Sequence, residues 1–326
     1  MELAIALGYV VLGLALLTGG GEALVRGATA IARIAGLTPA VIGLTIVAMG
    51  TSLPELVVSV IAAVREQPDI AVGNVVGSNI FNIAVVLGVT ALILPLPVRS
   101  GVVRLEWPVM FAVSVLALVF ARDHLLDRAE GGFFLLSLVI FTAWVVRLAR
   151  REVTARERAE YTEEVEQRTL HPRRGREMIV SVGAVLLGVG LLIGGGHALV
   201  EGAATLARLA GMSERVIGLT VVAAGTSAPE LATSLVAAWR RQTDVAVANC
   251  IGSNIFNILG ILGVTAVVTP TPISPAVLSS DMWWMLGTSL VLFPLMRTNM
   301  RIGRTEGGIL FAIYLTYLAL LLRSGA

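Results

Sequence analysis

The heptapeptide GTSLPEL occupies residues 50–56, and GTSAPEL occupies residues 225–231. Each copy places one carboxylate, two hydroxyls and a proline inside a long apolar stretch. Hydrocarbon penalises a charge that nothing compensates, so ionisable residues at membrane depth are candidates for function. A bound cation would compensate the carboxylates of Glu55 and Glu230. The repeated stretch therefore predicts a cation site inside a membrane.

The composition is that of a membrane protein. Of the 326 residues, 56% are hydrophobic and 14% are charged, whereas charged residues make up about a quarter of an ordinary soluble domain. The charges lie between apolar runs of about 20 residues or more, the length that a helix needs to cross a bilayer. We therefore expect an all-α polytopic membrane protein. Ten transmembrane helices are predicted, near residues 3–34, 37–63, 70–97, 102–121, 130–149, 178–209, 214–239, 245–271, 276–297 and 306–323.

The two halves of the chain form a repeat at a shift of 175 residues (226 minus 51). At this shift the hexapeptide GSNIFN at residues 77–82 meets an identical hexapeptide at 252–257. Because each half has an odd number of spans, the second half starts from the opposite side of the membrane and is inverted. Inverted repeats are typical of alternating-access transporters, which bind their substrate near the midplane. We expect a first five-helix repeat at 1–149, a linker at 150–177 and a second, inverted five-helix repeat at 178–326.

The arginines predict the orientation. All 24 basic residues are Arg and the net charge is only +2, so we interpret the basic residues as a topology signal and not as a nucleic-acid surface. An external N-terminus puts 18 of the 24 arginines on the inner side, in agreement with the positive-inside rule. Both termini are therefore expected to be extracytoplasmic and the 150–177 linker cytoplasmic. The single cysteine, Cys250, excludes an internal disulfide.

Each heptapeptide gathers oxygen atoms beside a helix break. Thr51 and Glu55 are four residues apart and share a helix face. Pro54 lacks an N–H and its ring crowds the carbonyl four residues back, so the helix must open or kink there. Carboxylate, hydroxyl and carbonyl oxygens suit Ca²⁺ or Na⁺ and do not suit zinc or copper. Proline with Ser and Thr can also serve only to tune a kink, but a kink alone needs no Glu.

The second pair of motifs supplies amides. Ser78 and Asn82 are four residues apart, as are Ser253 and Asn257, so each pair shares a helix face. Alone, such a run would more often join helices by hydrogen bonds; beside two Glu residues we expect it to complete an oxygen shell. Two carboxylates can hold one divalent ion or two or more monovalent ions. If the empty site is unfavourable in the apolar interior, it changes sides only when loaded, as in an exchanger.

With these motifs the chain resembles the sodium/calcium exchanger family of the cation/calcium antiporter superfamily, in its short prokaryotic form. Residues 43–88 and 218–263 look like the alpha-repeats of that family. The resemblance implies Na⁺/Ca²⁺ exchange by alternating access, in a prokaryotic cell (inner) membrane. It also implies that the long first and sixth helices slide, a movement that the glycine triplets at 19–21 and 194–196 would suit. The cation ligands that it implies are Ala48, Thr51, Ser52, Glu55, Ser78 and Asn82, with Ala223, Thr226, Ser227, Glu230, Ser253 and Asn257.

One position departs from the family pattern. Some relatives carry Asp where this chain has Asn257, and potassium-dependent relatives use an Asp in this region. This chain has asparagine at both positions, Asn82 and Asn257. This argues against K⁺ co-transport and leaves two intramembrane acids. The coupling stoichiometry therefore cannot be carried over from a relative that has three intramembrane acids.

Three functions are compatible with these residues. The leading one is Na⁺/Ca²⁺ antiport, with no enzymatic activity, no cofactor, no nucleic-acid partner, and a monomer in the lipid bilayer as the sufficient unit. An H⁺/Ca²⁺ or other divalent-cation antiporter on the same fold stays open because Glu55 or Glu230 could carry protons; the neighbouring Thr and Ser favour Na⁺. A cation channel is less favoured, because this chain itself supplies both halves of the site, whereas a channel subunit supplies part of a symmetric pore.

Overall fold

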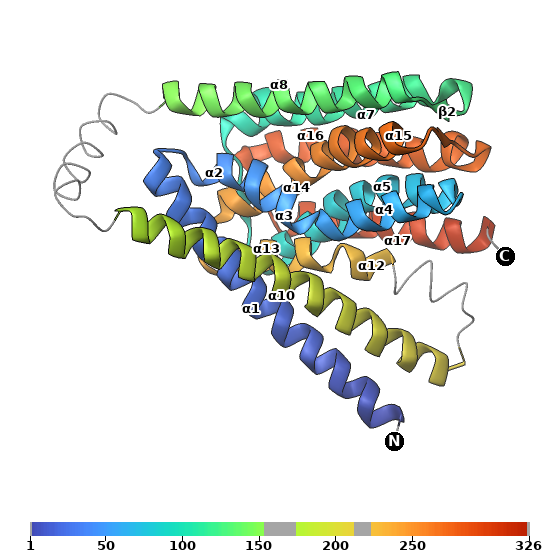
Figure 1. Cartoon of the computed structure of the whole chain (residues 1–326), viewed down its shortest axis with the longest axis horizontal. Helices are drawn as coiled ribbons and strands as arrows, with labels where there is room; N and C mark the ends of the chain where they lie inside the picture. Colours follow the sequence, from blue (N-terminus) through green and yellow to red (C-terminus); the bar gives the residue numbers. More distant parts are fainter. Residues whose placement is uncertain (1, 153–173, 212–222, 325–326) are drawn as a thin grey trace.

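The computed structural model describes residues 2–152, 174–211 and 223–324, and this part of the chain is nearly all helical. Figure 1 shows a bundle of roughly parallel helices crossed obliquely by two longer ones. The described elements of the first half are α1 (Glu2–Ala35), α2 (Pro39–Ile42), the π-helix η1 (Gly43–Val47), α3 (Ala48–Thr51), α4 (Leu53–Val64), α5 (Pro68–Phe81), the π-helix η2 (Asn82–Leu87), α6 (Gly88–Ile93), β1 (Leu96–Pro97), the π-helix η3 (Val102–Glu106), α7 (Trp107–Phe120), the 3₁₀ turn η4 (Ala121–Asp123), β2 (Leu125–Leu126) and α8 (Arg128–Glu152).

The second half repeats this order. Its described elements are α10 (Arg174–Leu209), α12 (Ala223–Thr226), α13 (Ala228–Trp239), α14 (Thr243–Phe256), the π-helix η6 (Asn257–Leu262), α15 (Gly263–Val268), β3 (Thr271–Pro272), the π-helix η7 (Val277–Asp281), α16 (Met282–Arg297), the 3₁₀ turn η8 (Thr298–Met300), β4 (Arg301–Ile302) and α17 (Arg304–Ser324). Most of the expected 150–177 linker lies outside the described residues.

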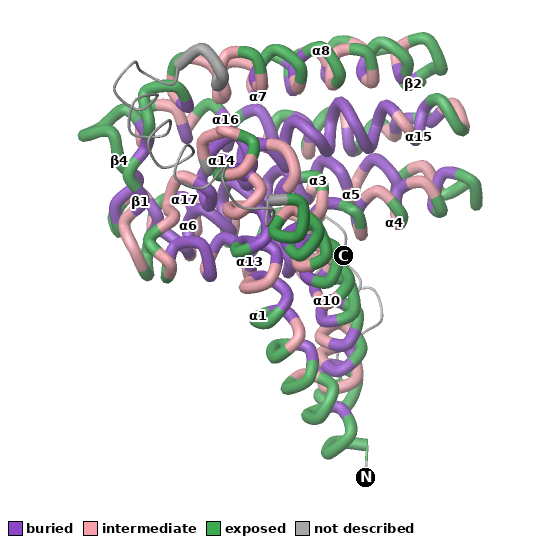
Figure 2. Tube along the Cα trace, turned by 60° about the vertical axis from the view of Figure 1, so that its left-hand side comes forward, coloured by how far each residue is buried: buried purple, intermediate pink, exposed green. Residues whose placement is uncertain are grey.

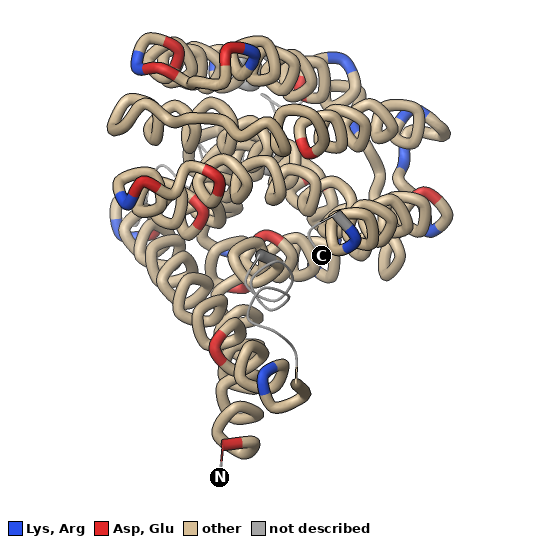
Figure 3. Tube along the Cα trace, turned by 90° about the vertical axis from the view of Figure 1, so that its right-hand side faces the viewer, with Lys and Arg blue, Asp and Glu red and all other residues tan. Residues whose placement is uncertain are grey.

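The spans confirm an all-α polytopic membrane protein. Seven described helices are long and apolar enough to cross a membrane, and the bent pair Ala40–Thr51 and Leu53–Val64 makes an eighth. Figure 3 shows how few positions along the helices carry a charge. The expected count of ten stays a prediction, because the start of the 214–239 helix falls in 212–222, outside the described part, and the helical 276–297 segment is not among the seven.

The helix breaks lie where the prolines predict them. Between α3 and α4 the chain bends by 45°, and Ser52 leaves the helical region with φ −86° and ψ 8°. Ser227 has nearly the same backbone, φ −91° and ψ 8°, between α12 and α13. Pro54 and Pro229 then occupy the first turn of the next helix, where a missing N–H is tolerated. Both heptapeptides therefore form a broken helix, as predicted.

The centre of the bundle is made of two long, mostly buried spans, Pro68–Ile93 and Thr243–Val268. Figure 2 shows the buried residues concentrated there, while the free lengths of α1 and α10 are largely exposed. Each central span changes from α- to π-helix at one residue, Asn82 in the first and Asn257 in the second. Single π-helical turns inside α-helices are frequent at functional sites.

Two short strand pairs join the halves. β1 pairs with β4, with Leu96 opposite Ile302, and β2 pairs with β3, with Leu126 opposite Thr271. Both pairs are antiparallel and each contains one strand from either half. The backbone groups of the loops are thus satisfied by the opposite repeat, which fixes the two halves against each other.

The oblique helices α1 and α10 pack through small residues that recur every seven positions. Gly13 faces Gly195, and Gly20 faces Gly188, so the two helices run antiparallel. A Cβ added at Gly188 would lie 2.6 Å from the backbone nitrogen of Leu24. Such contacts exclude any side chain, and close backbone approach of this kind is how membrane helices associate.

The three residues of each glycine triplet face different neighbours. In the first triplet Gly20 faces α10 and Gly21 faces Val236 of α13, while an added Cβ at Gly19 has no atom of the described residues within 4 Å. The second triplet is divided in the same way, with Gly196 facing Gly225. Only one residue of each triplet lies in the α1–α10 contact, so within the triplets only Gly21 and Gly196 face the helices past which α1 and α10 are expected to slide.

Adding one methyl group tests this contact. Gly188→Ala should destabilise the protein by about 1–3 kcal/mol, because the new Cβ meets backbone that cannot move away. Gly190→Ala is the matched control, since an added Cβ there has no atom of the described residues within 4 Å. Thermal unfolding in detergent measures both variants. Equal unfolding midpoints for the two would contradict the packing described.

Candidate cation-binding site

The site residues come from the two helix breaks and from the residues that lead into the π-turns. Ser52 and Glu55 flank the first break, and Ser227 and Glu230 flank the second. The side chains of both glutamates are 1% exposed, deep inside the bundle. Of the other expected ligands, Thr226 is half-buried and Ala223 begins α12. The remaining ones are buried: Ala48, Thr51, Ser78, Asn82, Ser253 and Asn257.

The two glutamates are linked by reciprocal hydrogen bonds between the halves. Ser52 Oγ donates to Glu230 Oε1 at 3.0 Å, and Ser227 Oγ lies 3.2 Å from Glu55 Oε1. Ser78 Oγ lies 3.2 Å from the same Ser227 oxygen. The serine of each heptapeptide therefore serves the carboxylate of the other, and the two predicted motifs form one site.

Several buried oxygens of this site have no hydrogen-bond donor within the described part of the chain. They include the second carboxylate oxygen of Glu55 and of Glu230, and the amide oxygens of Asn82 and Asn257. Buried acceptors without a donor are rare in proteins. Carboxylate and amide oxygens are the ligands that Ca²⁺ and Na⁺ use, and no cluster of three or more His, Cys, Asp or Glu occurs among the described residues. The oxygen set fits a hard cation.

Two asparagines that the sequence analysis did not single out hold the glutamate helices in place. Asn74 Nδ2 donates to the backbone oxygen of Glu55 at 3.1 Å and to Ser59 Oγ at 3.0 Å. Its counterpart Asn249 donates to Ser234 Oγ at 3.3 Å and lies 3.4 Å from Thr51 Oγ1. The signal in the sequence that could have found them is that both halves carry asparagine at this position of the repeat.

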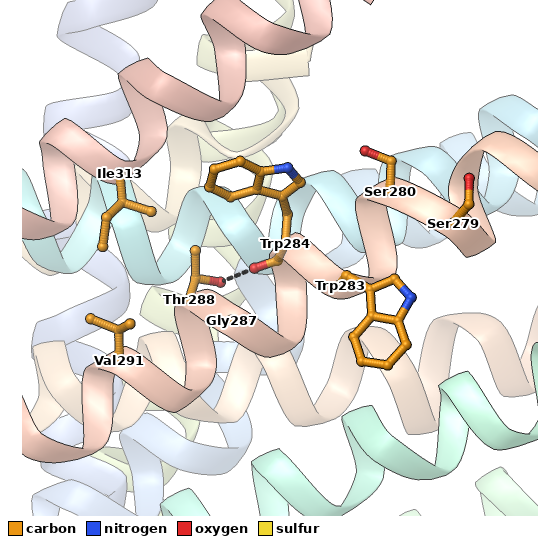
Figure 4. Close-up of a pocket in the computed structure, with 8 residues that line it drawn as sticks. All are labelled: Ser279, Ser280, Trp283, Trp284, Gly287, Thr288, Val291 and Ile313. Carbon is orange, nitrogen blue, oxygen red and sulfur yellow. Dashed lines mark hydrogen bonds between the residues drawn. The ribbon is translucent and has the colours of Figure 1, made fainter.

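A surface groove lies away from this site. Figure 4 shows it along α16, with a volume of about 450 Å³ and with Trp283, Trp284 and Gly287 in its lining. At the position equivalent to Gly287 the first half has Phe111, whose ring stacks on Trp107 at 5.3 Å. Loss of that ring opens the groove, and none of the expected cation ligands lines it.

Comparison with known proteins agrees with this chemistry. The family model described as sodium/calcium exchanger protein matches residues 5–147 and 180–323. The putative antiporter CaxA of Alkalimonas amylolytica is 40% identical over 320 residues, 97% of this chain and 98% of that protein. The sodium/calcium exchanger MaX1 of Methanosarcina acetivorans is 31% identical over 339 residues, 96% and 97% of the two chains.

A solved structure shares the fold. The sodium-calcium exchanger NCX_Mj, soaked with Na⁺ and Sr²⁺, superposes with a TM-score of 0.81 at 32% identity, covering 97% of this chain and 98% of that one. These proteins are transporters and not enzymes. The chain therefore belongs to the sodium/calcium exchanger protein family.

Proposed function

We propose that this chain exchanges Na⁺ for Ca²⁺ across a cell membrane, with both ions competing for the site between Glu55 and Glu230. The observation that carries the proposal is the reciprocal pairing of Ser52 with Glu230 and of Ser227 with Glu55, which leaves one carboxylate oxygen of each glutamate without a donor in the described residues. The twelve oxygen-bearing residues expected from the sequence are proposed to bind the ions together.

Charge balance explains the competition. Two ionised glutamates carry two negative charges in an interior that solvates them poorly, and one Ca²⁺ or a pair of Na⁺ ions neutralises them equally well. Ligands at the site are otherwise neutral, since hydroxyls and amides surround the carboxylates. Occupancy by one kind of ion thus excludes the other, which couples the two fluxes.

The packing of α1 supports alternating access. Gly21 of α1 approaches Val236 of α13, and Thr29 Oγ1 donates to Gln242 at 3.0 Å. Val236 is 5% exposed, whereas Ile61, its counterpart on α4, is 45% exposed. One side of the pseudo-symmetric bundle is covered by an oblique helix and the other is not. We propose that the covered side is closed in this state and that the uncovered side is the one from which ions enter.

An ion pair holds the covered side. Glu22 of α1 pairs with Arg240, which follows the last residue of α13. The equivalent side chains on the open side are His197 and Arg65, and neither makes an ion pair within the described residues. A state open on the other side would replace this ion pair by a contact between His197 and Arg65. The two access states are therefore expected to differ in free energy, although the two halves of the chain are similar.

We propose an orientation in the membrane from the distribution of the arginines. We place both termini outside the cell and the 150–177 linker inside, between a first repeat at 1–149 and a second at 178–326. Arg240 then lies on the cytoplasmic side and the exposed face of α4 opens outward. A single chain contains both heptapeptides, so a monomer is sufficient for transport.

Removing either carboxylate tests the site. Glu55→Gln and Glu230→Gln should each lower Na⁺-gradient-driven Ca²⁺ uptake into proteoliposomes by about 100-fold or more, because one divalent charge is then left half-neutralised in a poorly solvating interior. Glu66→Gln, at an exposed acid, is the control. Uptake driven by a pH gradient alone would instead indicate proton coupling, and a flux unaffected by both substitutions would exclude these ligands.

Thiol labelling tests the access state. For protein in detergent micelles, where a hydrophilic maleimide reaches both faces, Ile61→Cys in a Cys250→Ala background should react and Val236→Cys should be protected, because α1 covers only the latter. Adding Glu22→Ala should raise the labelling of Val236→Cys by about fivefold, since it removes the ion pair to Arg240.

Arg26→Gln is the matched control for that experiment. Arg26 pairs with Glu22 within α1, and among the described residues it makes no ion pair to α13 or Arg240, so its loss should leave the labelling unchanged. Equal reactivity at positions 61 and 236 in the unmodified background would contradict a structure open on one side.

A further inference from the structure

Four buried asparagines join the two central spans. Asn82 Nδ2 donates to Asn254 Oδ1 at 3.1 Å, and Asn257 Nδ2 donates to Asn79 Oδ1 at 3.1 Å. Each hydrogen bond runs from one half of the chain to the other, and all four side chains are 1% exposed. Asn79 and Asn254 lie within the GSNIFN motifs but were not expected to be ligands.

An amide has a donor end and an acceptor end of almost equal size, and only the acceptor end can bind a cation. In Asn82 and Asn257 the nitrogen is engaged by a neighbouring oxygen, and the oxygen has no donor among the described residues. The oxygen is therefore the end left for a cation. If either amide turned over, its NH₂ group would face the cation and its oxygen would face the oxygen of the partner asparagine.

The partner asparagines are themselves held in one orientation. Asn254 Nδ2 donates to the backbone oxygen of Asn79 at 3.2 Å, and Asn79 Nδ2 donates to Met285 Sδ at 3.5 Å. A carbonyl oxygen and a thioether sulfur can accept a hydrogen bond but cannot donate one. Each contact therefore requires a nitrogen at that end of the partner amide, which turns the other end, the oxygen, toward Asn82 or Asn257.

We propose that Asn79 and Asn254 are positioning residues, which accept the amide hydrogens of Asn257 and Asn82 and so turn the oxygens of those two side chains toward the transported cation. The inference rests on the proposed function, in that Asn82 and Asn257 bind the ion. The third residue of each GSNIFN motif thus orients a cation ligand and does not itself bind the cation.

The arrangement also ties the ligand at 257 to its neighbour. A carboxylate at position 257 would place an oxygen against Asn79 Oδ1, 3.1 Å from the present nitrogen. Asn79 would then have to turn its own amide and give up Met285. Asn257 and Asn79 therefore form a matched pair that keeps this ligand neutral, and the ionisable charge of the site stays with Glu55 and Glu230.

A double-mutant cycle with transport kinetics tests the proposal. Asn254→Leu removes the acceptor at nearly constant volume and should raise the KM for Ca²⁺ roughly tenfold, with less than about a twofold change in maximal rate. In an Asn82→Ala background the same Leu substitution should change KM by less than about twofold, because no amide is left at position 82 for residue 254 to orient.

The controls separate positioning from packing and from the function itself. Thr288→Val removes another buried hydroxyl, which within the described part of the chain bonds to carbonyls of its own helix, and should leave KM unchanged. If Asn254→Leu lowers the maximal rate or the unfolding midpoint equally in both backgrounds, with KM unaltered, the asparagine only packs and the proposal is wrong. Loss of transport in Glu55→Gln, measured in parallel, shows that the site works whichever way the cycle comes out; persistence of transport there would overturn the proposed function instead.

Discussion

The structure depends on keeping two carboxylates in an apolar interior. A buried carboxylate is tolerated only if its charge is neutralised and its oxygens are hydrogen-bonded or ligated. Here each glutamate receives one hydroxyl from the opposite repeat, through Ser52 and Ser227. The helix breaks place these serines within reach of the opposite glutamate. The broken backbone and the inverted repeat therefore both serve to stabilise the two buried charges.

The sequence was sufficient to predict the elements whose causes are local. Pro54 and Pro229 predicted the broken helices because a missing N–H acts within one turn. The repeat predicted that Glu55 and Glu230 would meet, since inversion brings equivalent positions together at the midplane. Membrane-spanning stretches were recognisable from length and apolarity alone.

Other features depend on packing between distant segments and were not predicted. The π-turns at Asn82 and Asn257 have no sequence signal of their own, because an extra residue in a helical turn is stabilised by neighbours. The orientation of an asparagine depends on which atoms its partner offers, so Asn79 and Asn254 were recognised only in the structure. The seven-residue spacing of Gly13 and Gly20 was present in the sequence but was obscured by the more obvious triplets.

The strand pairs have a consequence for how the protein is made. β1 lies at Leu96–Pro97 and its partner β4 at Arg301–Ile302, so the first repeat leaves the ribosome long before its loop can be completed. Contacts between residues so far apart in sequence form late and slow the acquisition of structure. The loop of the first half therefore lacks its partner strand until the second half has been made. The strand pairs can therefore form only after both repeats have been inserted, which makes their pairing a late step of folding.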